Sequence, residues 1–147
     1  MDVLMRMGPA PRTGSGPVLA LSRTVPATSA EASVLRRSFR AWIDGLADAD
    51  TADDLTLAVY EALANVVDHA YVSAPEAGEM RLWAAVSPPL SGGRDLVVTV
   101  TDDGAWRPST GSGWRGRGLP LMRTITCATV HSNAAGTTVQ MRRRVAP

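Results

Sequence analysis

Hydrophobic positions recur with helical spacing in two segments of the chain. Over residues 55–71 they keep a period of about 3.6 residues, which predicts an amphipathic helix. These positions are Leu55, Val59, Ala62, Leu63, Val66, Val67 and Ala70. An earlier helix is predicted to begin at Thr28-Ser29-Ala30-Glu31, which has the spacing of an N-terminal capping box. Gly45 stands where the C-terminus of that helix favours a left-handed residue. We expect the acidic residues 48–54 to connect the two helices.

Alternating apolar and polar positions in the rest of the chain predict strands. The predicted strands are residues 18–25, 80–86, 95–101, 128–132 and 137–144, and a short helix is expected at residues 119–125. Since most strands are joined as hairpins, the order predicts an α+β sandwich with a mostly antiparallel mixed sheet and helices on one face. Residues 1–17 are expected to form a disordered leader before a folded domain at residues 18–147.

Composition and charge exclude several classes of site. The formal net charge is +1, so the chain lacks the basic excess of a nucleic-acid-binding protein, and no apolar run is long enough to span a membrane. All 15 basic residues are arginine, which removes the P-loop and the protein-kinase fold, because both place a lysine on the nucleotide phosphates. Cys127 is the only cysteine, which fits a reducing cytoplasm, and we expect it to be a small buried hydrophobe.

Glu61 and Asn65 carry the first candidate chemistry. Four residues apart on a helix, they lie one turn above the other on a common face, and Asp68 falls near the same line. A carboxylate beside an amide can orient a hydroxyl or water and can hold a hard cation through oxygen.

Three motifs further along the chain are weak when each is taken alone. Gly116-Arg117-Gly118 opens into a helix, where free backbone N–H groups suit a phosphate, although a plain surface loop explains it as well. Asp102-Asp103-Gly104 follows a strand and is suited to accept a hydrogen bond from an amino group, or simply to form a turn. Gly136-Thr137 offers a hydroxyl to the same pocket, or forms only a hairpin turn.

Together and in this order, the four motifs resemble the Bergerat (GHKL) ATP-binding fold. The segments EALANVVDHAY (residues 61–71), Trp106-Arg107-Pro108 and GRGLPLMRTI (residues 116–125) resemble more narrowly the bacterial anti-sigma-factor serine/threonine kinases of actinobacterial type. The resemblance extends from residue 18 to about residue 143. The sequence departs from the common Asp-x-Gly-x-Gly pattern at one position, where Trp106 replaces the final glycine.

The resemblance implies a role for each matched residue. Glu61 is the general base on the attacking hydroxyl, and Asn65 helps to hold a Mg²⁺ ion that bridges the phosphates of ATP. Asp102 accepts from the adenine amino group, with Thr137 nearby through water, and Gly104 gives the base room. The remaining nucleotide-binding residues are Gly116 and Gly118, whose N–H groups meet the phosphates, and Leu119.

The function that follows is a cytoplasmic, Mg-ATP-dependent serine/threonine kinase that is also an anti-sigma factor. Its implied partners are a sigma factor and a small STAS-type antagonist protein that it phosphorylates, and a homodimer is implied as well. Trp106 motivates a second hypothesis, a regulatory protein-binding module for which ATP is a structural ligand or is not turned over at all.

Overall fold

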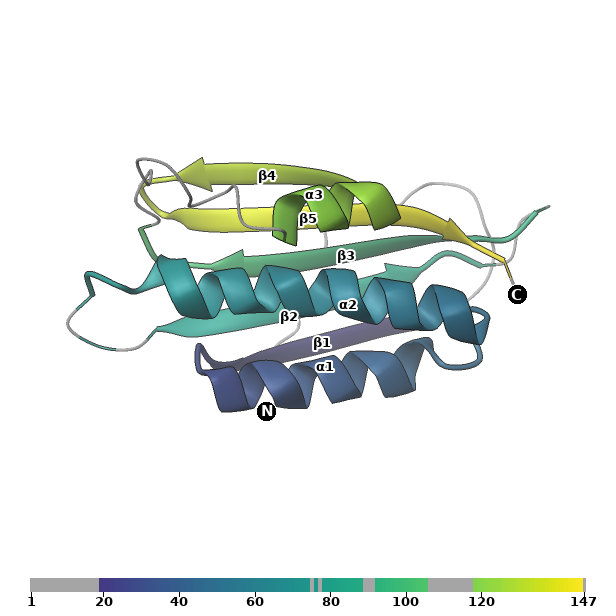
Figure 1. The fold of residues 1–147 in the computed structure, drawn as a ribbon, viewed down its shortest axis with the longest axis horizontal. Coiled ribbons are helices and arrows are strands. Elements are labelled where there is room, and N and C mark those ends of the chain that lie inside the picture. The colour runs from purple at the N-terminus through teal and green to yellow at the C-terminus, as the bar shows by residue number, and fades with distance from the viewer. Residues whose placement is uncertain (1–18, 75, 77, 89–91, 106–117, 147) are drawn as a thin grey trace.

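The computed structural model describes residues 19–74, 76, 78–88, 92–105 and 118–146, so the expected leader lies outside the described residues. Five strands form one sheet in the order β1-β2-β3-β5-β4, and the helices cover one of its faces (Figure 1). The strands are β1 (Leu19–Pro26), β2 (Glu79–Val86), β3 (Arg94–Asp102), β4 (Cys127–Asn133) and β5 (Gly136–Val145). The helices are α1 (Ser29–Ile43), α2 (Ala49–Asn65), the π-helix η1 (Val66–Ala70) and α3 (Gly118–Ile125). The α+β prediction is confirmed, and every ladder between these strands is antiparallel.

Helix α1 begins and ends at the signals that the sequence carries. The Thr28 hydroxyl accepts the Glu31 N–H (3.2 Å), while the Thr28 N–H donates to the Pro26 carbonyl oxygen. Gly45 follows the C-terminus with a φ of 81°, in the left-handed region that glycine adopts without a steric penalty. The predicted cap at Thr28 and the left-handed Gly45 are confirmed, but the capping box is only half formed, because the Thr28 N–H bonds to Pro26 and not to the Glu31 side chain.

Helix α2 differs from the prediction at both ends. The acidic segment is not the connection, because Asp48 caps the helix and residues 49–54 form its first turns. The Asp48 carboxylate accepts the Thr51 N–H and the Thr51 hydroxyl, both at 2.8 Å, and carboxylates near a helix N-terminus are favoured by the helix dipole. At the other end the α-helix stops at Asn65, and residues 66–70 continue it as a π turn.

The core lies between the helices and one face of the sheet. Phe39 and Ile43 of α1 and Leu63 of α2 are fully buried there, and alternate residues of the central strands face them. The alternate positions that are buried in β2 and β3 include Met80, Leu82, Ala84, Val86, Leu96, Val98 and Val100. Cys127 starts edge strand β4 and is exposed, so its expected burial is wrong. An edge strand has a neighbour on one side only, which here is β5.

Candidate functional site

The C-terminal end of α2 carries the predicted carboxylate and amide. Glu61 and Asn65 are both half-buried and lie one turn apart, as the sequence predicts. Neither side chain forms a hydrogen bond with another residue of the described part of the chain. Asp68, in contrast, belongs to the π turn and is exposed. Since a π turn adds a residue to each turn, Asp68 leaves the α-helical line that the sequence suggested.

Asp102 and Thr137 form the second part of the site, at the end of the sheet. They are directly opposite each other in the β3–β5 ladder, and their exposed fractions are only 1% and 2%. The Asp102 carboxylate accepts the Gly104 N–H at 2.9 Å, and the Thr137 hydroxyl shares a hydrogen bond of 2.9 Å with the Ser132 hydroxyl. The predicted proximity of Asp102 and Thr137 is thus produced by the strand register.

Two glycines allow the segments of this end to approach one another closely. A Cβ atom on Gly104 would overlap the carbonyl oxygen of Ala70, the last residue of η1. A Cβ atom on Gly136 would overlap the Asp102 carbonyl oxygen, and Gly136 also has a φ of 147°. The end of η1, the segment after β3 and the β4–β5 turn therefore pack together, at the left of the view in Figure 1.

A network that sequence reasoning missed fixes the segment after β3. The Tyr71 hydroxyl donates to the Glu79 carbonyl oxygen and accepts the Asp103 N–H at 3.0 Å. Arg81 donates two hydrogen bonds to the Asp103 carboxylate, at 2.9 and 2.8 Å. The Tyr71 ring lies where a Gly78 side chain would be. The end of η1, the start of β2 and the segment after β3 are thus joined around the residue that follows Asp102.

The charges in this network agree with its hydrogen bonds. Burial raises the pKa of the Tyr71 phenol above its ordinary value, so the hydroxyl remains protonated and able to donate near neutral pH. The two hydrogen bonds from Arg81 lower the pKa of Asp103. Asp103 is therefore a carboxylate that fixes the loop, while the buried Asp102 beside it faces the helices.

The predicted phosphate-binding segment is described only in part. Gly118 is the first residue of α3, Leu119 is half-buried against the core, and Met122 anchors the helix with a fully buried side chain. Helix α3 packs against α2. Gly116 and Trp106 lie outside the described residues.

Neither a carboxylate–histidine metal centre nor a membrane span emerges from the parts of the chain that the structure covers. There, no three His, Cys, Asp or Glu side chains gather closely enough to hold a metal ion. Among the same residues, no helix has both the length and the apolar character needed to cross a membrane.

Residues 25–143 match the family of histidine kinase-like ATPase domains. The chain belongs to this family. A histidine kinase-like ATPase domain implies ATP binding, and the buried Asp102, Gly104 and Thr137 lie together at one end of this one. Helices α2 and α3 place Glu61, Asn65 and Leu119 on the elements that border the same end.

The first of two similar solved structures supports the fold of this histidine kinase-like ATPase domain. The RsbU and RsbW domains of Rv1364c from Mycobacterium tuberculosis match with a TM-score of 0.65 and 23% identity over 88% of this chain. The chain covers 33% of that protein. The blue-light-activated histidine kinase of Erythrobacter litoralis EL346 matches with a TM-score of 0.48 and 25% identity, over 80% of this chain and 64% of that one. No curated protein matches significantly.

Proposed function

We propose that this domain is a Mg-ATP-dependent serine/threonine kinase that phosphorylates a small STAS-type antagonist and binds a sigma factor directly. The observation that carries the ATP part is the buried Asp102 carboxylate opposite Thr137, beside Gly104. A carboxylate buried at a strand end can accept a hydrogen bond from the exocyclic amino group of adenine. A base without that group would leave the buried carboxylate without this partner and would bind more weakly, which gives selectivity for adenine. The regulatory part is supported by the motif resemblance and by the fold shared with the RsbW-containing mycobacterial structure.

Asn65 fits a role as a magnesium ligand. Its side-chain oxygen is of the hard type that Mg²⁺ prefers, and Mg²⁺ commonly keeps few protein ligands when phosphates supply the others. When bound, Mg²⁺ would neutralise phosphate charge during transfer. The N–H groups of Gly116, Gly118 and Leu119 would bind phosphate oxygens at the start of α3.

Glu61 would act as the general base. Its carboxylate would accept the proton of the attacking serine or threonine hydroxyl, while the oxygen of that hydroxyl forms the bond to the γ-phosphorus and the bond to ADP breaks. The half-buried position of Glu61 on the last turns of α2 leaves part of the carboxylate accessible for such a hydroxyl.

Calorimetric titration with Mg-ATP, followed by transfer of labelled phosphate to candidate antagonists, tests the two parts separately. Asp102→Asn should weaken ATP binding by about tenfold or more, which is at least about 1.4 kcal/mol. Glu61→Gln should leave binding largely intact and reduce transfer by about 100-fold to 10,000-fold. Asp68→Asn, an exposed carboxylate on the following turn, is the matched control and should change neither.

The outcomes separate the hypotheses. If the unmodified chain does not bind Mg-ATP, both the kinase and an ATP-clamped regulatory module are excluded. If it binds ATP but transfers phosphate to no antagonist, the alternative of a regulatory module with ATP as a structural ligand is favoured. The cytoplasmic homodimer implied by the resemblance is part of the proposal, and light scattering of the purified chain tests the dimer.

A further inference from the structure

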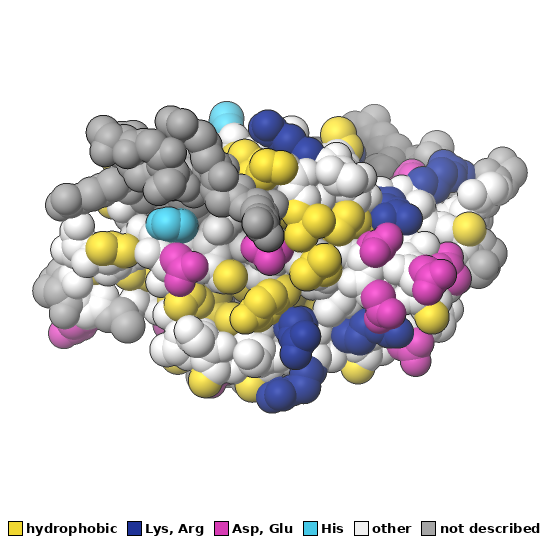
Figure 2. Space-filling view, viewed as in Figure 1, with side chains coloured by type: hydrophobic (Ala, Val, Ile, Leu, Met, Phe, Trp, Pro, Cys, Tyr) yellow, Lys and Arg dark blue, Asp and Glu magenta, His cyan; other side chains and the backbone are white. Residues whose placement is uncertain are grey.

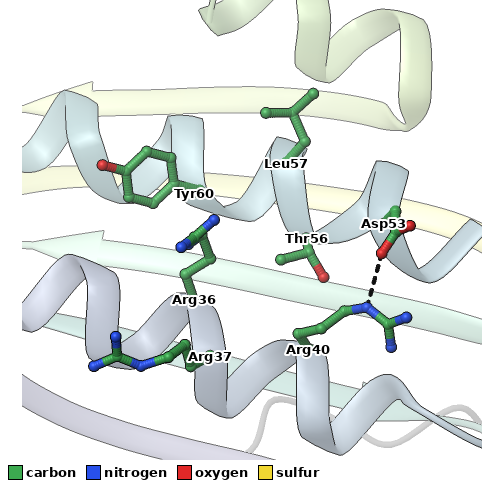
Figure 3. A pocket seen from close by; sticks show the side chains of 7 residues that line it. All are labelled: Arg36, Arg37, Arg40, Asp53, Thr56, Leu57 and Tyr60. Carbon is green, nitrogen blue, oxygen red and sulfur yellow. Dashed lines mark hydrogen bonds and ion pairs between the residues drawn. The ribbon is translucent and has the colours of Figure 1, made fainter.

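A groove of about 330 Å³ lies between α1 and α2, on the solvent side of the helical layer (Figure 3). One wall is formed by Arg36, Arg37 and Arg40 of α1. The other wall, on α2, includes Asp53, Leu57 and Tyr60. Figure 2 shows basic side chains gathered over α1 and its border with α2, beside exposed hydrophobic side chains.

Two of the three arginines retain uncompensated charge. Arg40 forms ion pairs with Asp53 (2.9 Å) and Asp44 (3.4 Å). Arg36 and Arg37 have no ion-pair partner within the described part of the chain. The Arg36 guanidinium lies 5.4 Å from the centre of the Tyr60 ring, an attraction that holds the cation at the groove and leaves its N–H donors available.

The groove also presents an apolar surface. Leu57 is 44% exposed and lies in the α2 wall of the groove. Thr56 and Tyr60 complete the α2 wall beside it, as the close-up in Figure 3 shows. A wall of arginines facing an exposed leucine and a tyrosine ring has the composition of a site that binds part of another protein.

We propose that this groove binds an acidic segment of a partner protein, with an aliphatic side chain of that segment seated against Leu57 and Tyr60. Charge complementarity carries the choice of partner, because Arg36 and Arg37 offer two guanidinium groups to carboxylates. Because Asp44 and Asp53 neutralise Arg40 and the formal net charge of the chain is only +1, the groove lacks the extended positive charge that the continuous phosphates of a nucleic acid require.

The groove is distinct from the proposed nucleotide site. Leu57 lies one turn before Glu61 on α2, so the two sites share a face of that helix and are separated along its axis. The groove residues of α2 all precede Glu61 and Asn65, and none of them is among the proposed nucleotide-binding residues. The groove proposal does not depend on ATP binding.

The test uses the full chain and a fluorescein-labelled synthetic peptide in which glutamates and leucines recur at helical spacing. Binding is measured by fluorescence anisotropy, with and without Mg-ATP, and located by amide chemical shifts. We expect saturable binding that perturbs α1 and α2 along the groove. The double variant Arg36→Gln/Arg37→Gln should weaken it by about tenfold, corresponding to two partly exposed charge pairs. Leu57→Ser should weaken it as well.

Three controls give the test its force. Arg142→Gln, an exposed arginine of β5 on the sheet, should leave peptide affinity unchanged. A peptide with glutamine in place of glutamate should bind at least about tenfold more weakly if charge pairing dominates. Equal binding of the glutamine peptide, equal binding of a single-stranded DNA oligonucleotide, shifts away from the groove, or no binding at all would each overturn the proposal. Because Arg36, Arg37 and Leu57 are exposed, circular dichroism should report an unchanged fold in the variants.

Discussion

Arg81 pairs with Asp103, beyond the end of β3, and not with Thr101, its register partner in that strand. The ion pair therefore crosses the ladder diagonally and fixes a residue that no strand holds. Because Asp103 lies between Asp102 and Gly104, this pair and the Tyr71 hydroxyl determine where the proposed adenine-binding segment lies. Stability and ligand binding can thus be tested separately at the same residues.

Arg81→Gln should loosen this segment more than it destabilises the fold. Asp103 is 63% exposed, so solvent screening limits the loss of unfolding free energy to less than about 1 kcal/mol. We expect faster hydrogen exchange at the Asp103 and Gly104 amides, and ATP affinity lowered about threefold to tenfold if Asp102 binds adenine. Urea unfolding, amide exchange and calorimetry measure the three quantities. Arg23→Gln on exposed β1 is the control, and equal exchange rates in the two variants would contradict a positioning role for Arg81.

Tyr71→Phe should cost more stability than its small chemical change suggests. The ring still packs over Gly78, but the Asp103 N–H loses its acceptor, with an expected cost of about 1–3 kcal/mol. Tyr60→Phe is the matched control, since that ring lines an open groove. If Tyr71→Phe is as stable as Tyr60→Phe, the Tyr71 hydroxyl does not stabilise the fold through its hydrogen bonds.

The same tyrosine gives a pH dependence with a definite sign. Its pKa is raised above 10.0 by burial, so the folded state favours the protonated phenol. The contribution of the hydroxyl is therefore fully present below the ordinary pKa and is lost as the pH rises through the higher folded value. The difference in unfolding free energy between the unmodified chain and Tyr71→Phe should be constant from neutral pH to about pH 10 and shrink above it. A difference that grows with pH would contradict this assignment.

Gly104→Ala tests the close approach of η1 to the segment after β3. The added Cβ would overlap the Ala70 carbonyl oxygen, which belongs to backbone and has little room to move. We expect a loss of about 1–3 kcal/mol, as for other overpacked positions, together with shifted amide resonances around Ala70 and Asp102. Gly45→Ala should lower the unfolding free energy only by the strain of placing alanine at a positive φ. It should disturb only the end of α1, because open space surrounds that position. Equal spectral changes at Asp102 in both variants would be inconsistent with the proposed contact.

Asp48 should titrate below its ordinary pKa of 3.8. The Thr51 backbone N–H is the main cause, followed by the Thr51 hydroxyl, and both favour the ionised carboxylate. The cap therefore contributes above pH 3.8 and its contribution is lost as the pH falls through the lower folded value. Carboxyl NMR titration measures this shift directly. Asp48→Ala should lower the melting temperature at neutral pH more than Asp50→Ala does, since Asp50 is an exposed acid of the same turn. A larger decrease for Asp50→Ala would contradict the role of Asp48 as a stabilising cap.

The sequence was informative wherever a structure depends on neighbours along the chain. Contacts within one turn or one pleat are enough to predict the capping residue of α1, the left-handed glycine after that helix and the alternating strands. The start of α2 was misjudged because its acidic first turn has little apolar periodicity, although Asp48 and Thr51 carry a cap signal. The π turn after Asn65 has no comparable local signature.

The sequence by itself predicted most of the elements and the α+β class, and it proposed the site residues Glu61, Asn65, Asp102, Gly104 and Thr137, because periodicity and short motifs are local. Only the tertiary structure decided the strand order, which brings Asp102 opposite Thr137 and allows Gly104 and Gly136 to approach their neighbours closely. It also decided the Tyr71–Arg81–Asp103 network and the arginine-lined groove between α1 and α2. These depend on register and on helix packing, which join segments far apart in the chain and which no local pattern encodes.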